Sequence, residues 1–445
     1  MQQYDSYKPS GVKWIGEIPS HWKVERLKIN CTLKGRVGWK GLSSNEFKDT
    51  SYAYLVTGQD FDGSVIQWNK CYEIDKWRYD EDPFIQLQNG DLLVTKDGTI
   101  GKIAKVSDLD KPACLNSGIF VLKQRDNQFC QDYLYWTLVS SQLKDFTDYN
   151  SGGQTTIQHL YQNVFEDMPL IIPPLEEQER IAEYLERRCA EIDGIITKEE
   201  QAITLLDELK QTLISEAVTR GLDPTVPLKP SGVDWIGNIP SHWQVSRLKN
   251  TACLFGRIGY RGYTVADLVN QGEGVITLSP SNMVNGSMDY TSCSYLSWKK
   301  YYESPEIMIK NGDILLVKTG STYGKTSYVS DLPMEATINP QIVVFKSIAG
   351  NSKFLFYLLT THFLQHQIKR GVGGSTIPTL SEGFILNCMH PLPPLEEQER
   401  IAEYLDKRCA EIDEAKERKQ RQIELLREMK QIMISDTVTG RVKVF

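Results

Sequence analysis

The chain has 445 residues, of which 40% are hydrophobic and 24% are charged. This composition excludes a disordered or fibrous protein and is typical of a globular chain with about two to four domains. Lys and Arg number 50 against 57 Asp and Glu, a net charge of −7, which argues against a phosphate-binding surface that covers the whole molecule.

The sequence contains no signal for a membrane, for export or for a metal site. No apolar run approaches the roughly 18 to 20 residues that a membrane-spanning helix needs, and the polar first residues lack an apolar export segment. We therefore expect a cytoplasmic protein. The nine Cys include no C-x-x-C pair, so we expect reduced thiols and no zinc site.

Two segments of the chain occur twice with few changes. Residues 8–28 return at 229–249 with 17 of 21 positions identical, and residues 173–193 return at 393–413 with 19 of 21 identical. A period above 200 residues is too long for a solenoid and indicates a tandem duplication of a domain with a helical arm. The segments between these anchors are alike only in short stretches, which suggests a common frame that carries two different recognition surfaces.

The predicted elements follow the same order in both halves. Short apolar stretches with turn signals, such as GDLLVTKDGTIGK (90–102), predict strands joined by tight turns, while residues 133–146 and 354–369 predict helices. The fold class is α+β, with two mixed α/β domains in tandem and two long helices that form an antiparallel coiled coil. The predicted segments are a first domain (1–172), a first helical region (173–220), a second domain (221–392) and a second helical region (393–445).

The first helical region follows Pro173 and Pro174 and begins with acidic residues, as helix N-termini prefer. The linker RGLDPTVPLKP (220–230) ends it with three Pro. Each arm of about 40 residues would be roughly 60 Å long. Because a globular segment separates the arms, we expect their apolar stripes to pack on each other in antiparallel fashion; the alternative is that each arm packs on its own domain.

The heptad pattern of the arms predicts the residues of the coiled-coil seam. Arg408, Lys419 and Gln422 interrupt it in the second arm, and because of Lys419 and Gln422 we expect a looser or asymmetric coil near its middle. The predicted seam residues are Ile181, Leu185, Ile192, Leu206, Leu209, Leu213, Ile401, Leu405, Ile412, Leu426, Met429 and Met433.

Motifs of catalysis are missing. GSTYGKT (320–326) has three residues between its glycines where a P-loop needs four, and His362 and His366 occur without the glutamate of a zinc protease motif. No G-x-S-x-G elbow is present, and both Pro-Pro pairs are followed by Leu rather than by the aromatic residue of an aminomethyltransferase site. A binding subunit without catalytic or metal-ligating residues is therefore the favoured interpretation.

Glycine-flanked loops with basic and aromatic residues recur at matching places in both halves. Glycine lets the backbone approach a phosphate, Arg and Lys supply charge, and uncharged polar residues suit base edges. Each loop alone is also compatible with an ordinary solvated turn. The residues predicted to contact DNA are Lys34, Arg36, Trp39, Lys40, Lys96, Lys102, Gln154, Thr155, Arg257, Tyr260, Arg261, Lys318, Lys325, Ser375 and Thr376.

Over its whole length the chain resembles the specificity subunit of a type I restriction-modification system. The resemblance is carried by two copies of W-I-G-x-I-P-S-H-W, from Trp14 and Trp235, and by two copies of P-P-L-E-E-Q-E-R-I-A-E-Y-L. The linker sequence RGLDPTVPLKPSGVDWIG and D-G-T-I-G-K at 97–102 add to it.

The resemblance implies a non-catalytic DNA-binding subunit without a cofactor of its own. Each globular segment would be a target recognition domain that reads one half of a split, asymmetric DNA sequence, and the coiled coil would set the spacer between the halves. Two modification subunits, which bind S-adenosylmethionine and methylate adenine, would dock on the helices. Restriction subunits would join for cleavage that depends on ATP and Mg.

Three alternatives remain open. The chain could be a two-domain coiled-coil scaffold that joins proteins without reading a sequence, or the recognition subunit of another restriction class. A fused methyltransferase or nuclease is disfavoured by the missing motifs.

The negative charge belongs mainly to the first arm. Residues 173–220 carry −6 and residues 393–445 carry −1, while the domains carry −3 (1–172) and +3 (221–392). The two domains are therefore neutral together, and we expect them to hold DNA through local basic loops.

Overall fold

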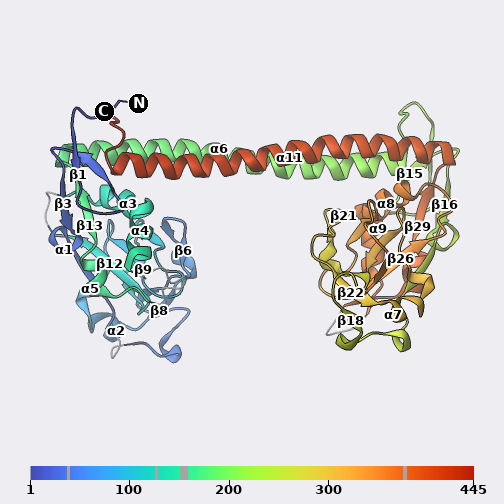
Figure 1. Ribbon diagram of the computed structural model, residues 1–445, viewed down its shortest axis with the longest axis horizontal. Helices are drawn as coiled ribbons and strands as arrows, with labels where there is room; N and C mark the ends of the chain where they lie inside the picture. The colour runs from blue at the N-terminus through green and yellow to red at the C-terminus, as the bar shows by residue number, and fades with distance from the viewer. Residues whose placement is uncertain (1, 38–40, 126–128, 151–158, 374–377) are drawn as a thin grey trace. The chain divides into compact units, whose positions relative to one another are not determined.

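The computed structural model describes residues 2–37, 41–125, 129–150, 159–373 and 378–445 (Figure 1). The chain divides into two compact units, Met1–Glu199 with Arg421–Phe445 and Glu200–Gln420. Each unit contains one globular domain and part of each long helix, α6 (Leu175–Arg220) and α11 (Leu395–Val438).

The first domain is built on two sheets. The larger is antiparallel with the strand order β10-β9-β12-β4, and in the smaller, of order β11-β5-β8, β11 runs parallel to β5. The strands of both sheets are β4 (Cys31–Gly35), β5 (Ala53–Val56), β8 (Tyr72–Ile74), β9 (Leu92–Thr95), β10 (Ile103–Lys105), β11 (Ala113–Leu115) and β12 (Ile119–Gln124). The other strands form pairs: β1 (Tyr7–Pro9) with β2 (Glu17–Pro19), β3 (Lys23–Arg26) with β13 (Pro169–Ile172), and β6 (Phe61–Asp62) with β7 (Val65–Ile66). The helices of this domain are α1 (Leu27–Asn30), α2 (Lys76–Asp80), α3 (Gln131–Val139), α4 (Ser141–Asn150) and α5 (Gln162–Glu166).

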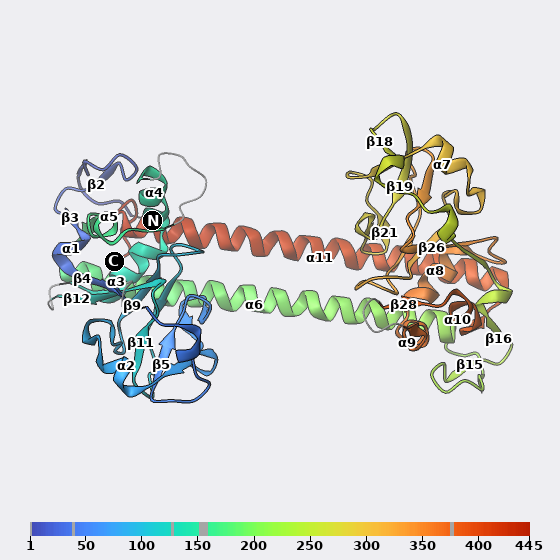
Figure 2. The same ribbon diagram turned by 90° about the horizontal axis from the view of Figure 1, so that it is seen from below.

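Strand β9 is buried on both faces. Leu92 and Val94 belong to the core cluster that also contains residues of α3, α4 and α6, whereas Leu93 belongs to the cluster formed with β5 and β11. Figure 2 shows β9 with α3 on one side and β11 and β5 on the other. Burial on both sides explains why this strand is a continuous apolar run and does not alternate with polar residues.

The second domain repeats this arrangement. Its antiparallel sheet has the order β17-β26-β23-β24, and its second sheet, also of four strands, has the order β18-β22-β19-β25, with β25 parallel to β19. The strands of both sheets are β17 (Cys253–Gly256), β18 (Leu268–Val269), β19 (Gly274–Leu278), β22 (Ser294–Ser297), β23 (Ile314–Val317), β24 (Thr326–Tyr328), β25 (Ala336–Ile338) and β26 (Ile342–Lys346). The paired strands are β14 (Leu228–Pro230) with β15 (Asn238–Pro240), β16 (Gln244–Arg247) with β29 (Met389–Leu392), β20 (Met283–Val284) with β21 (Ser287–Met288), and β27 (Val372–Gly373) with β28 (Thr379–Leu380). The helices are α7 (Trp298–Tyr302), α8 (Ser352–Thr360), α9 (His362–Arg370) and α10 (Glu382–Asn387).

The two repeated sequence segments contact each other in each unit. The indole of the fully buried Trp22 donates its N–H to Oε2 of Glu177, 2.9 Å away, and His21 lies 2.8 Å from Oε1 of the same carboxylate. In the second unit, Trp243 makes the same 2.9 Å bond to Glu397. This joint fastens the start of each long helix to its domain, which explains why these segments stayed alike.

The long helices run antiparallel within each unit. In both views α6 and α11 lie side by side (Figures 1 and 2). Within each unit, lysines on one helix pair with aspartates on the other, and in the second unit the lower-numbered residue of α6 pairs with the higher-numbered residue of α11, as antiparallel pairing requires. These pairs are Lys430 with Asp193 in the first unit, and Lys210 with Asp413 and Lys416 with Asp207 in the second.

The seam of α6 follows a heptad spacing of alternating three and four residues. The row with Leu185, Ile192, Leu206 and Leu213 lies on the seam as predicted. The second row begins at Ala182 and continues through the positions 189, 196, 203 and 210, one residue later than predicted. The side chain of Leu209 is accordingly 44% exposed. The observed row is favoured because it buries Cys189 and Ile196, while Arg188 and Ile195 stay exposed.

Helix α11 shows the same shift. Leu405, Ile412, Leu426 and Met433 are buried or half-buried, but Met429 is 48% exposed. Gln422 is exposed and the next residue, Ile423, is buried. Contrary to the prediction, Gln422 therefore lies outside the seam and does not interrupt it. Lys419 lies half-buried on the seam.

The ends of both helices also belong to the domain cores. Ile181 and Leu185 share a cluster with Ile434 and Val438 under the first domain, and Ile401 and Leu405 pack in the second. Each arm therefore packs both on the other arm and on a domain. Across the described residues, none of the helices combines the length and the apolar character that crossing a bilayer requires.

Candidate nucleic-acid interface

Four loops of the first domain meet at one edge of its sheets. They follow β4 (residues 36–37 and 41–46), β5 (57–60), β9 (96–102) and β11 (116–118), and we call them the first loop cluster. Backbone bonds join three of them, because the N–H of Lys96 donates to the carbonyl of Gly118 and the N–H of Asn116 to that of Val56, both at 2.9 Å.

The second domain forms a matching second loop cluster. Its loops follow β17 (257–264), β19 (279–282), β23 (318–325) and β25 (339–341). The equivalent backbone bonds run from Lys318 to Gln341 at 2.7 Å and from Asn339 to Leu278 at 2.9 Å. The same edge is thus built twice.

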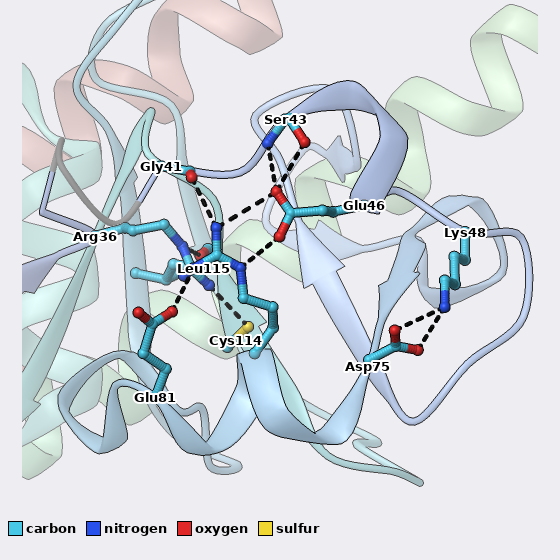
Figure 3. Close-up of polar contacts among 10 residues, drawn as sticks. Arg36, Gly41, Ser43, Glu46, Lys48, Asp75, Glu81, Cys114 and Leu115 are labelled. Atoms are coloured by element: carbon cyan, nitrogen blue, oxygen red, sulfur yellow. Dashed lines mark hydrogen bonds and ion pairs between the residues drawn. The ribbon is translucent and has the colours of Figure 1, made fainter.

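Arg36 holds the first of these loops from inside the domain. Its side chain is only 2% exposed, Nε donates to the carbonyl of Leu115 at 2.9 Å, and Nη2 lies 3.4 Å from Sγ of Cys114 (Figure 3). Arg257 is 5% exposed and donates to the carbonyl of Ile338 at 3.1 Å. The prediction that these two arginines contact DNA is corrected, since their guanidinium groups face the protein interior and order the loops.

A second arginine holds the same loop from the other side. Arg78 of α2 donates from Nη2 to the carbonyl of Gly41 at 2.9 Å and from Nε to Glu46 at 2.6 Å, and it also pairs with Glu81 (Figure 3). The hydrogen bond from Arg78 holds the pKa of the Glu46 carboxyl at about 2, and Ser43 adds two further donors. The described part of the loop is therefore held in place by hydrogen bonds from two arginines and a serine.

The predicted lysines and Arg261 lie on or beside the clusters in different settings. Lys34 and Lys102 are exposed, and Nζ of Lys34 lies 5.8 Å from the ring centre of the exposed Phe84. Lys325 donates to the carbonyl of Pro280 at 3.2 Å, which ties two loops together. The guanidinium of Arg261 is 3.2 Å from Glu306.

Lys96 and Lys318 occupy equivalent positions with different neighbours. Nζ of Lys96 lies 4.9 Å from the ring centre of Phe120, whereas Nζ of Lys318 is 2.7 Å from Glu382. Six predicted residues fall outside the described part of the chain. The side chain of Tyr260 also falls outside it. The six are Trp39, Lys40, Gln154, Thr155, Ser375 and Thr376.

Two asparagines in the clusters escaped the prediction from sequence. Asn116 and Asn339 directly follow the buried strands β11 and β25, and each is half-buried. The Oδ1 atoms accept backbone N–H bonds from Ser117 at 2.7 Å and from Gln341 at 3.0 Å. Amide side chains suit the adenine edge. The only signal for these asparagines in the sequence was that they occupy matching positions in the two halves. Their neighbours share neither a glycine nor a charge pattern.

Among the residues with described positions, no three His, Cys, Asp or Glu side chains gather as metal ligands would. What the clusters offer is a set of lysines, amides and backbone groups on a fixed support, which is the chemistry of phosphate contact and base reading.

Comparisons with known proteins agree with this architecture. A family model described as "Type I restriction modification DNA specificity domain" matches residues 19–205 and 255–425. The MjaVIII specificity subunit of Methanocaldococcus jannaschii is 26% identical over 434 residues, covering 96% of this chain and 94% of its own length. The EcoBI specificity subunit of Escherichia coli is 24% identical over 334 residues, 73% of this chain and 67% of that protein.

Two solved structures share the fold. One comes from work on complex assembly and conformational transition of the type I R-M system, with a TM-score of 0.72 and 19% identity over 96% of this chain and 99% of that one. The other is the HsdS subunit from Thermoanaerobacter tengcongensis, with a TM-score of 0.52 and 18% identity over 96% and 98%. With both halves matched by the family model, the chain belongs to the specificity subunits of type I restriction-modification systems.

Proposed function

We propose that this chain reads a bipartite, asymmetric DNA target in the cytoplasm, with one half-site assigned to each domain. The observation that carries the proposal is the duplicated loop cluster. Both clusters are fastened by an equivalent buried arginine, and yet they present different side chains. A common frame with different reading groups is what two different half-sites require.

The differences lie in the groups that could reach base edges. The loop after β5 has the sequence Thr-Gly-Gln-Asp at 57–60, and its counterpart at 279–282 is Ser-Pro-Ser-Asn. The turn at 116–118 is Asn-Ser-Gly, against Asn-Pro-Gln at 339–341. Donors and acceptors in a different order select different base pairs in the major groove.

A domain exchange tests this assignment. Residues 30–170 are replaced by the equivalent domain of another specificity subunit, and methylated adenines are mapped across the genome of a host that expresses the chain with its modification subunit. We expect one half-site to change and the other to remain. A change in both half-sites, or methylation without a sequence preference, would contradict the model of two independent readers.

We further propose that α6 and α11 set the spacer between the half-sites. Seven residues inserted into each helix at matching repeat positions, after Glu200 and after Gln420, keep the heptad register and lengthen the coil by about 10 Å. At about 3.4 Å per base pair, the recognised spacer should grow by about three base pairs with unchanged half-sites. An unchanged spacer would refute the ruler role.

Exposed apolar residues outside the seam supply docking surfaces for two modification subunits. In the second unit they are Leu205 and Leu209 of α6, and in the first unit their repeat counterparts are Leu425 and Met429 of α11. Neighbours at i and i+4 form a stripe that suits an apolar helix of a partner. One stripe in each unit predicts two copies of the same partner.

This assembly places the chemistry in the partners. S-adenosylmethionine would be bound by the modification subunits, ATP and Mg by the restriction subunits, and the chain described here would be non-catalytic. The double variant Leu205→Glu with Leu209→Glu should lower the mass of the complex by one modification subunit, as native mass spectrometry would show. Retention of both copies would contradict these docking surfaces.

A further inference from the structure

Lys96 and Lys318 are held by the same backbone contacts in the two domains. The N–H of each donates to the turn that precedes the adjacent strand, as described above. The carbonyls accept from Leu160 at 2.9 Å and from Leu380 at 2.8 Å. Since the backbone positions are equivalent, any difference between the two ammonium groups arises from the side chains around them.

In the second domain, Lys318 forms an ion pair with an acidic residue. Its side chain is 17% exposed, and Nζ lies 2.7 Å from Oε1 of Glu382, the first residue of α10. The pair lies against the backbone of β17, because a Cβ atom on Gly256 would be 2.7 Å from Oε1 of Glu382 and 3.0 Å from Nζ of Lys318. The partly buried ion pair has no net charge.

The first domain differs from the second at two positions near Lys96. The acid is replaced by an amide, and an aromatic ring lies beside the ammonium group. Gln162 stands at the repeat position of Glu382 and donates Nε2 to the carbonyl of Leu33 at 3.1 Å and to Glu166 at 2.8 Å. Phe120 stands at the position of Val343, and its ring centre lies 4.9 Å from Nζ of Lys96. Among the described residues, no carboxylate lies within ion-pair distance of Lys96. An aromatic face orients an ammonium group without cancelling its charge.

We infer that the two lysines have different roles on DNA: Lys96 is a phosphate-binding residue, whereas Lys318 is held by Glu382 and contributes no net charge to the interface. The inference rests on the proposed function of the loop clusters. On this inference, the residue at position 162 or 382 decides whether the equivalent lysine adds one phosphate contact to its domain. A phosphate that approaches Lys318 would also meet the negative charge of Glu382, whose Oε1 is already 2.7 Å from Nζ.

The salt dependence of DNA binding tests this inference, since each neutralised phosphate contributes about 0.9 to the slope of log K against log salt concentration. The probe is a duplex with the target found by methylation mapping, bound by the complex of the full chain with its modification subunits. Glu382→Gln releases Lys318 and should steepen the slope by about one. The reciprocal change, Gln162→Glu, should reduce it by about one by pairing Lys96.

Asp234→Asn is the matched control, because it removes one exposed acid from the second domain away from the loop cluster. We expect an unchanged slope for this variant, and thermal unfolding should verify that all variants are folded. An unchanged slope for a folded Glu382→Gln variant, or a steepening equal to that of Asp234→Asn, would overturn the inference. A wild-type complex that binds target and random duplexes equally would instead refute the proposed function, and it would leave the slope comparison intact on any duplex.

Discussion

A Cβ atom added to Gly440 would lie 2.9 Å from Cζ3 of Trp22, so the chain just after α11 lies close against the joint of the first domain. Cδ of Pro19 would be nearer still, and Gly440 has a φ of +73° that favours glycine. In the second unit, Gly221 at φ +77° approaches Trp243 less closely, at 3.3 Å.

This difference predicts unequal effects of the same substitution. Gly221→Ala should lower the free energy of unfolding by about 1 to 2 kcal/mol through the left-handed conformation. Gly440→Ala should cost more, because steric overlap with two rigid rings is added. Thermal unfolding of both variants makes the comparison, and equal losses would contradict the close contact at Trp22.

The register of the seam predicts unequal effects for the same substitution at Leu206 and Leu209. Leu206→Glu would bury a charge between α6 and α11 and should destabilise the coil by about 2 to 3 kcal/mol. Leu209→Glu, on the exposed side, should change stability by no more than about 0.5 kcal/mol. Thermal melts followed by circular dichroism at the helix band compare them. A larger loss for Leu209→Glu would restore the register predicted from the sequence.

His390 predicts an acid-sensitive second domain. His390 is buried, and its Nε2 forms a 3.2 Å hydrogen bond with the hydroxyl of Thr251. Burial lowers its pKa from an ordinary 6.5 to about 4. Between these values the unfolded chain binds a proton that the folded chain does not, so the free energy of unfolding falls as pH drops from 6.5 to 4. The full effect is about 3 kcal/mol.

The first domain supplies the control substitution for this pH effect. Leu170 occupies the repeat position of His390, so His390→Leu should remove this part of the pH dependence while keeping an apolar core. Denaturant unfolding between pH 4 and 7 measures it. Identical pH profiles for the variant and the wild type would exclude His390 as the source.

The contact between the two termini predicts that the chain tolerates circular permutation. The N–H of Lys443 donates to the carbonyl of Gln2 at 2.9 Å, and the hydroxyl of Tyr7 donates to Gly440 at 3.1 Å. A variant opened between Asp223 and Pro224, with Phe445 joined to Met1 by a short Gly-Ser linker, should keep both joints. Its melting temperature should remain within a few degrees of the wild type, and the mapped target should be unchanged. Loss of folding would show that the covalent linker at 221–227 is needed.

Much of the architecture could be predicted because the duplication leaves a long-range signal in one chain. The repeats at Trp14 and Trp235 and the two acidic helix starts indicate the tandem domains and the long helices without any knowledge of packing. The seam was harder, since the row with Leu185 and Ile192 belongs to both possible registers. Only the second row, with Ile195 or Ile196, distinguishes them.

The loop residues could be predicted only in part. An arginine after a glycine looks like a phosphate contact in the sequence, but Arg36 turns inward because β11, about 80 residues further on, offers the carbonyl of Leu115. Similarly, nothing near Lys318 in sequence indicates that Glu382 neutralises it. Both features depend on strands and helices that meet only after folding.

The joint between an indole and a helix-start carboxylate is the same in both units, and this bears on how the protein changes over generations. Because the contacts at the joint do not depend on the loops, a recognition domain can be replaced without changing its attachment to the long helix. The near-identical segments that form the joints also provide matching stretches of coding sequence. We expect new combinations of half-sites to arise by recombination at these stretches, with the frame inherited intact, rather than by stepwise substitution within one domain.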